Sequence, residues 1–127
     1  KIRIAGTSNG AALANRILIE NNNSGVDIIC AIVSQLSECN YHNNDFHSPS
    51  GATGGGAPDC GYDVVQTPLS GRKYLSICNT NDPLIPYQGG ASVGVVFLNA
   101  QLSTYIVAKS QGYQGFCEQY EPPLSIH

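Results

Sequence analysis

Ser8 lies in a glycine-bounded segment whose residue types suit nucleophilic catalysis. The segment reads GTSNG at residues 6–10, between a strand-like stretch and an Ala-, Leu- and Ile-rich, helix-like stretch. A G-x-S-x-G pattern in that context holds the serine on a strained turn that tolerates only small neighbours. Gly6 and Gly10 then leave space where strand and helix approach, and the Asn9 N–H faces a developing oxyanion. We expect Ser8 to be the nucleophile and Asn9 the oxyanion donor; an ordinary turn or helix N-cap at Ser8 is the alternative.

Asp82 is the candidate acid of a catalytic triad. It follows a strand-like run at 73–79 and precedes Pro83, which stiffens the loop that carries the carboxylate. Triad acids of α/β-hydrolases follow the nucleophile in the chain order Ser, Asp, His. An Asp before Pro is also a common turn former, which is the alternative reading of Asp82.

A triad also needs a general base, for which the sequence offers His42, His47 and His127. His42 and His47 come between Ser8 and Asp82, the wrong order for this arrangement, and are expected in a solvated loop or on the substrate side. His127 has the right order but no glycine before it. Only ten residues separate it from Cys117, little room for a further strand, and it is kept as a candidate base.

The elements that must position these residues alternate along the chain. Strands are expected at 1–5, 26–34 and 73–79, and helices at 11–20 and 92–112. Such alternation predicts an α/β fold, a parallel sheet flanked by helices. With about three strands and two main helices, residues 1–127 are expected to form one partial domain.

Residues 35–63 are rich in Gly, Asn and Ser and are expected to form a long lid-like or irregular loop. Its aromatic residues Tyr41, Phe46 and Tyr62 are candidates to line the substrate side. The alternative for this segment is a disordered surface loop.

Five cysteines allow one disulfide within the loop. Cys39 and Cys60 flank the loop and are a possible pair, because a bond between them would restrict about twenty residues. Cys30 and Cys78 lie in apolar, strand-like runs and are expected to be buried thiols. Cys117 is left without a partner. No pair has a zinc-ligand spacing such as C-x2-C, so no metal site is expected, and no cofactor is indicated.

Composition excludes several function classes. The net charge is −3 and charged residues make up 12% of the chain, so no basic surface predicts nucleic-acid binding. The most apolar run, at 93–98, is far too short to span a membrane. No leader sequence is visible, and both ends of the chain give the impression of a longer protein that has been cut.

Two segments resemble a known family. GTSNGAALANRIL and ICNTNDPLIPYQGG are similar to the polyhydroxybutyrate depolymerase, feruloyl esterase and acetyl xylan esterase group of secreted α/β-hydrolases. In that group the nucleophile segment commonly reads G-x-S-N-G, and the acid loop reads like G-T-x-D-x-x-V-P-Y-x-G-G. The positions that match the acid-loop pattern are Thr80, Asp82, Pro86, Tyr87, Gly89 and Gly90. Asn79 replaces the usual glycine and Ile85 the valine. The resemblance covers residues 1–20 and 73–117 well and the middle loop poorly.

The resemblance implies a secreted serine esterase that acts on acyl or aryl esters of plant polysaccharide or on polyester chains, through an acyl-enzyme at Ser8. It also implies that the N-terminal strands, the catalytic-histidine segment and the partner of Cys117 lie outside this sequence. The chain alone would then be inactive.

Two further readings stay open. One is a non-catalytic α/β-hydrolase relative that serves as a carbohydrate- or partner-binding module. The other is a different hydrolase chemistry, such as a peptidase or thioesterase. In each case a partial sheet predicts exposed strand edges and self-association.

Overall fold

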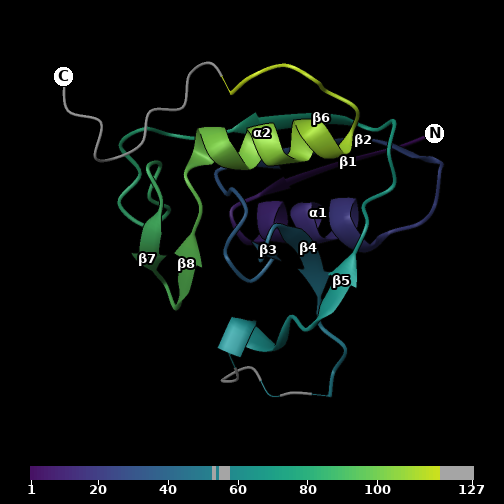
Figure 1. Cartoon of the computed structure of the whole chain (residues 1–127). Helices are drawn as coiled ribbons and strands as arrows, with labels where there is room; N and C mark the ends of the chain where they lie inside the picture. The colour runs from purple at the N-terminus through teal and green to yellow at the C-terminus, as the bar shows by residue number, and fades with distance from the viewer. Residues whose placement is uncertain (53, 55–57, 118–127) are drawn as a thin grey trace.

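The fold is mixed α/β, as the element order predicted. The structure is a computed structural model and describes residues 1–52, 54 and 58–117. These residues form a three-stranded parallel sheet, a three-stranded antiparallel sheet, a two-stranded hairpin and two α-helices (Figure 1). The α/β class is therefore confirmed at this level.

The parallel sheet consists of β1 (Ile2–Thr7), β2 (Val26–Ile32) and β6 (Lys73–Ile77), in the order β1-β2-β6. Its central strand β2 has the β-branched apolar run expected of a strand flanked on both sides. Thr7 pairs with Ile32, and Ile32 with Ile77, so the three carboxyl ends lie level. The segments that follow the strands thus emerge at one edge of the sheet.

Both helices pack on the same face of this sheet. Helix α1 (Asn9–Glu20) lies over β1 and β2, and α2 (Ala100–Ser110) lies beside it (Figure 1). On that face the Tyr74 hydroxyl of β6 donates to Asn15 Oδ1 of α1 at 2.7 Å. The side chain of Asn99 caps α2 by accepting from the N–H of Leu102 at 3.0 Å.

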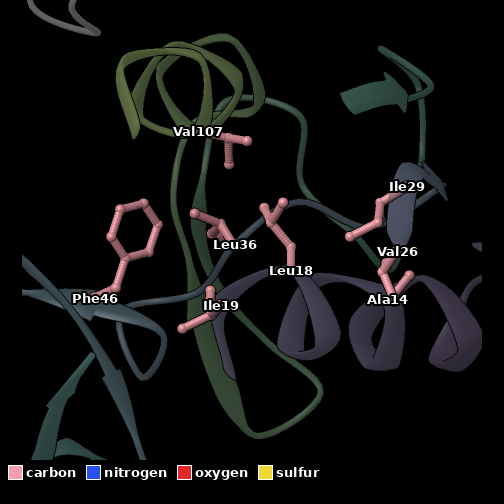
Figure 2. Close-up of a cluster of buried hydrophobic side chains, with 8 residues drawn as sticks. All are labelled: Ala14, Leu18, Ile19, Val26, Ile29, Leu36, Phe46 and Val107. Carbon is pink, nitrogen blue, oxygen red and sulfur yellow. The ribbon is translucent and has the colours of Figure 1, made fainter. Parts of the chain in front are cut away.

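The core lies between the two helices, the sheet and the middle segment of the chain (Figure 2). Its buried apolar side chains are Ala14, Leu18, Ile19, Val26, Ile29, Leu36, Phe46 and Val107. Since these come from α1, β2, α2 and residues 35–63, the middle segment belongs to the core.

The segment 35–63 is more ordered than the expected irregular loop. It contains β3 (Tyr41–His42), β4 (Asp45–Ser48) and a 3-10 turn (Pro58–Gly61), and β5 (Val64–Gln66) completes an antiparallel sheet. Asn43 and Asn44 both have positive φ, 52° and 62°, as the turn of a tight hairpin requires. A disulfide joins Cys39 to Cys60, the pair that the sequence left possible beside two free thiols.

The helix expected at 92–112 is wrong over its first third. A hairpin of β7 (Gly90–Ser92) and β8 (Val95–Phe97) precedes α2. Gly94 has a φ of 85° at the turn, and the run of valines around it favours strand over helix. The apolar residues of this run therefore follow the two-residue period of a strand and not the 3.6-residue period of a helix.

The face of the parallel sheet opposite the helices is largely open. Leu75 and Ile77 of β6 point to that face and are 54% and 46% exposed. None of the described helices covers it, and none is long and apolar enough to cross a bilayer.

At the amino end of the sheet, Arg72 ties several segments together. Its buried guanidinium donates to the carbonyls of Leu18, Asn21, Asn23 and Val26 at 2.7–3.1 Å. These carbonyls belong to the last turn of α1, the turn after it and the start of β2.

Candidate functional site

Ser8 occupies the turn between β1 and α1 in a strained backbone conformation. Its φ is 59° and its ψ is −117°, a region that non-glycine residues rarely adopt. The Ser8 N–H donates to the Ile32 carbonyl at 2.9 Å, which fixes the turn to the carboxyl edge of β2. Its carbonyl accepts from the N–H groups of Ala11 and Ala12, which start the helix. The residue itself is exposed at the sheet edge.

The two glycines around Ser8 differ in their packing. A Cβ atom at Gly6 would collide with the carbonyl of Gly10, so the strand and the helix approach too closely there for any side chain. A Cβ atom at Gly10 would meet nothing within 4 Å. The expectation that both glycines keep the space clear is therefore wrong for Gly10, because its missing side chain would point into open space.

Asn9 is the first residue of α1, and its side chain is exposed. A backbone N–H at this position has no partner within the helix and lies at the positive end of the helix dipole. Asn9 lines the same cavity as Ser8.

Ser8 and Asn9 line a cavity of about 460 Å³. Its walls come from α1, from the segment after β2, from the disulfide and from the hairpin. The lining residues are Ser8, Asn9, Ala12, Leu13, Arg16, Ser34, Gln35, Ser37, Cys39, Asn40, Cys60, Tyr62, Ile85, Val93, Val95 and Phe97. The hairpin and Leu13 make much of this lining apolar.

Of the three aromatic residues expected on the substrate side, only Tyr62 lines this cavity. The Arg16 guanidinium lies 5.7 Å from the Tyr62 ring centre and makes a bidentate ion pair with Glu20. Tyr41 and Phe46 instead pack edge to face at 5.0 Å in or beside the core. The spacing of aromatic residues in the sequence could not separate these two roles.

Asp82 lies in the loop after β6, at the same edge of the sheet as Ser8. Its Oδ1 accepts from the N–H groups of Leu84 and Ile85, both at 2.9 Å. These two hydrogen bonds hold the pKa of the Asp82 carboxyl below its ordinary value. Asp82 does not itself line the Ser8 cavity, but Ile85 of the same loop does.

The hairpin and the start of α2 anchor the loop that follows Asp82. The Tyr87 carbonyl accepts from the Ala100 N–H at 2.9 Å, and Asn99 Nδ2 donates to Gln88 Oε1 at 2.9 Å. Gly89 has a φ of 92°, and a Cβ atom there would press on the backbone of residues 97–99. A glycine is therefore required at this point of the loop.

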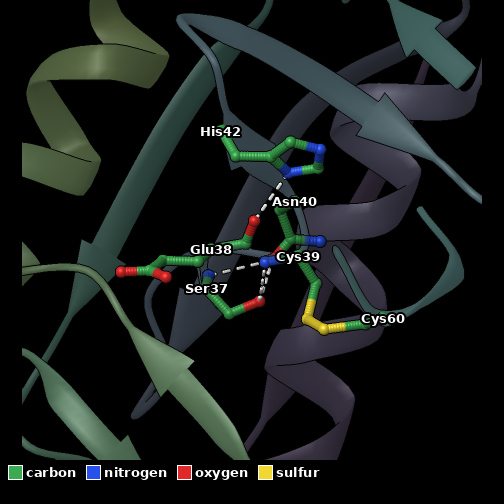
Figure 3. The surroundings of a disulfide bond; sticks show 6 residues. All are labelled: Ser37, Glu38, Cys39, Asn40, His42 and Cys60. Atoms are coloured by element: carbon green, nitrogen blue, oxygen red, sulfur yellow. Dashed lines mark hydrogen bonds between the residues drawn. A yellow bond between two sulfur atoms is a disulfide. The ribbon is translucent and has the colours of Figure 1, made fainter. Parts of the chain in front are cut away.

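Neither described histidine faces Ser8. His42 and His47 stack with ring centres 3.7 Å apart in the antiparallel sheet, and neither lines the Ser8 cavity. His42 Nδ1 lies 2.7 Å from the Glu38 carbonyl oxygen, next to the disulfide (Figure 3). The expectation of a solvated His47 is wrong, because β4 pairs on both sides and the residue is buried. His127 lies outside the described residues.

The remaining cysteines are free thiols in the described part of the chain. Cys30, Cys78 and Cys117 are half-buried, so the expectation of buried thiols at 30 and 78 is met only in part. Cys78 and Cys117 line a second cavity of about 460 Å³ between β6 and α2. Within the described residues no three His, Cys, Asp or Glu side chains are grouped to hold a metal ion.

Gln35 is a site residue that the sequence did not reveal. It is buried, lines the Ser8 cavity and follows β2 at the carboxyl edge of the sheet. The available signal was its place: a polar residue directly after a buried strand, at the edge where α/β proteins bind ligands.

Comparison with known proteins reveals no relative of this chain. No protein-family model, curated protein or solved structure matches the chain.

Proposed function

We propose that this chain carries the nucleophile and the acid of a serine carboxylic-ester hydrolase with an α/β-hydrolase-type sheet. The observation that carries the proposal is the conformation of Ser8: a φ of 59° at an exposed strand-to-helix turn, with Gly6 against the Gly10 carbonyl. Such strain persists where the surrounding structure holds it, and it is typical of functional sites. Here it presents a hydroxyl beside the free N–H groups of a helix start.

In the proposed reaction a histidine takes the proton from Ser8 Oγ while the oxygen attacks the ester carbonyl. The Asn9 N–H stabilises the tetrahedral oxyanion, and Asp82 orients the imidazolium. The histidinium then protonates the leaving alcohol. Water, deprotonated by the same histidine, cleaves the acyl-enzyme and regenerates Ser8.

The base of this reaction is a histidine outside the described residues. His127 is the source within this sequence, and a histidine beyond it is the source that the family resemblance implies. Replacing His127 with Ala in the protein as its gene encodes it distinguishes the two sources.

The cavity beside Ser8 favours esters with an apolar acyl or aryl group. Its apolar lining includes Val93, Val95 and Phe97, together with Ile85 from the acid loop and the Tyr62 ring. Polyester, feruloyl and acetyl ester substrates all fall within this class. The disulfide is compatible with a secreted protein, which is the location we propose.

The proposal is tested by hydrolysis of p-nitrophenyl butyrate by the protein as its gene encodes it. Ser8→Ala is expected to lower kcat/KM at least about a thousandfold, because the nucleophile is lost. Ser24→Ala, at an exposed serine after α1, is the matched control and should leave the rate unchanged. Equal rates for Ser8→Ala and the wild type would overturn the proposal.

The second candidate is a non-catalytic module that binds carbohydrate or a partner. The observation that favours it is that neither described histidine lines the Ser8 cavity. It predicts no ester hydrolysis by any form of the protein, together with saturable binding of oligosaccharides that Ser8→Ala does not abolish.

A further inference from the structure

Gln35 joins segments that lie far apart in the sequence. Its Nε2 donates to the Pro86 carbonyl at 2.7 Å and to the Leu98 carbonyl at 3.0 Å. The Gln35 residue is 3% exposed, so its amide group is held in a defined place. The Pro86 carbonyl also accepts from the Gly89 N–H at 2.9 Å. One side-chain amide thus bridges the end of β2, the loop after Asp82 and the residue before the Asn99 cap.

The position of Asp82 depends on the segment that Gln35 holds. The Asp82 carboxylate is bonded to the N–H groups of Leu84 and Ile85, and Pro86 follows directly. The loop thereby forms a short rigid link from Gln35 to the carboxylate. At its other end Gln35 follows β2, whose Ile32 carbonyl holds the Ser8 turn.

We propose that Gln35 is a positioning residue that aligns the Asp82 loop with the strand edge that carries Ser8. The role of this alignment in catalysis rests on the proposed function. The alignment itself is a property of the fold and can be measured without turnover.

The remaining contacts of the loop do not replace this link. The bonds from Ala100 and Asn99 reach Tyr87 and Gln88, on the side of Pro86 away from Asp82. The segment after β2 also holds the hairpin directly, since the Leu98 N–H donates to the Leu36 carbonyl at 2.9 Å. Among the described residues, the bond from Gln35 Nε2 is the one from this segment that reaches Pro86, next to the residues that bind the Asp82 carboxylate.

The test compares Gln35→Met with Gln111→Met. Methionine keeps the length of glutamine and removes its donors and acceptor. Gln111 is a suitable control because its Nε2 donates to the Leu69 carbonyl and its Oε1 accepts from the Arg72 N–H, an equivalent bridge at the far end of α2. Both variants therefore lose a segment-bridging amide.

NMR measures amide hydrogen exchange at Leu84 and Ile85, and the titration of the Asp82 carboxyl. Gln35→Met is expected to speed exchange at both amides at least tenfold and to move the Asp82 pKa up towards its ordinary value. Gln111→Met should do neither, and exchange at the Ser8 amide should stay unchanged in both. The proposal would be overturned if the exchange rates at Leu84 and Ile85 and the titration of Asp82 were the same in Gln35→Met as in Gln111→Met.

Gln35→Glu keeps the test decisive if Gln35→Met does not fold. The ionised carboxylate has no donor and faces two carbonyl oxygens, whereas the protonated form regains one donor. At each pH the exchange rates at Leu84 and Ile85 are divided by those of the wild type, because intrinsic amide exchange itself slows as the pH falls. This ratio should fall as the introduced carboxyl group becomes protonated, and a ratio that stays constant through that titration would contradict the role. Neither readout depends on enzymatic activity. If the Gln35 variants behave as expected but the protein hydrolyses no ester, only the proposed function is rejected.

Discussion

Gly6 and Ser8 lie in one tight strand-to-helix turn, in which Gly6 leaves no room for a Cβ atom and Ser8 has a φ of 59°. A non-glycine residue in such a backbone region costs about 1–3 kcal/mol. The hydrogen bond of the Ser8 N–H to Ile32 and the two bonds that its carbonyl accepts hold it there. The contacts at each position therefore predict that the fold depends on Gly6 and much less on Gly10.

Gly6→Ala is expected to lower the free energy of unfolding by about 3 kcal/mol, since its Cβ atom meets the rigid Gly10 carbonyl rather than a movable side chain. Gly10→Ala is the matched control. It should change stability by less than about 1 kcal/mol, because its Cβ atom enters open space and alanine suits a helix. Urea unfolding of both variants measures this, and equal losses would contradict the packing described for Gly6.

The pH dependence of stability follows from Asp82. Its folded pKa is lowered by the N–H groups of Leu84 and Ile85, so the unfolded chain binds this proton more readily. The resulting stability is present above the unfolded pKa and is lost as the pH falls through the folded pKa.

In Asp82→Asn this contribution is absent at every pH. We therefore expect the wild type to lose more stability than Asp82→Asn when the pH is lowered from neutral through the range of ordinary aspartates. Urea midpoints across that range provide the measurement. Parallel pH profiles for the two proteins would show that the loop hydrogen bonds do not lower the pKa of Asp82.

At the scale of elements, the sequence predicts what depends on local pattern. The run at 26–34 and the Ala-rich stretch after Ser8 became β2 and α1 because their composition and their tertiary surroundings agree. The hairpin before α2 was missed because valines at spacing compatible with a helix also alternate as a strand, and only Gly94 and the Asn99 cap decide between them.

Contacts between distant segments were beyond the sequence for a different reason. The bridging bonds of Gln35 and Arg72 join residues that lie 46–63 positions apart, and no local pattern marks them. Ser8, Gly6 and Asp82 could be proposed from the sequence because a short motif and the chain order single them out. No base could be proposed in the same way from the described residues, since neither His42 nor His47 lines the Ser8 cavity.

At the scale of elements, the prediction concerns the contribution of Arg72 to stability. Burial lowers the pKa of its guanidinium, and its donors satisfy carbonyls at the end of α1 and the start of β2. Arg72→Met leaves these carbonyls without a partner and should cost about 3 kcal/mol or more of unfolding free energy.

The control for Arg72 is Arg3→Met, at an exposed arginine of β1, where the change should stay within about 0.5 kcal/mol. Thermal and urea unfolding compare the two. If Arg72→Met loses no more unfolding free energy than Arg3→Met, water binds the carbonyls in place of the guanidinium.

At the scale of the whole molecule, the parallel sheet is covered by helices on one face only among the described residues. Parallel sheets occur almost always with both faces covered. Among the described residues, Leu75 and Ile77 therefore form an apolar surface on β6, which is an edge strand of the sheet, and this favours self-association.

The double variant Leu75→Thr/Ile77→Thr is expected to reduce this self-association, and threonine at both positions still suits a strand. Sedimentation velocity at increasing concentration should show the wild type departing from the monomer mass and the variant departing less. Val65→Thr, at a 58% exposed residue of the antiparallel sheet, should behave as the wild type. A wild type that stays monomeric at all concentrations would contradict the prediction.

The central claim is that Ser8 is a nucleophile, and covalent labelling tests it most directly. The protein as its gene encodes it is treated with a fluorophosphonate, digested and mapped by mass spectrometry. We predict one phosphonylated residue, Ser8, with labelling abolished in Ser8→Ala and unchanged in Ser24→Ala. Labelling elsewhere, or none in a folded protein, would contradict the account.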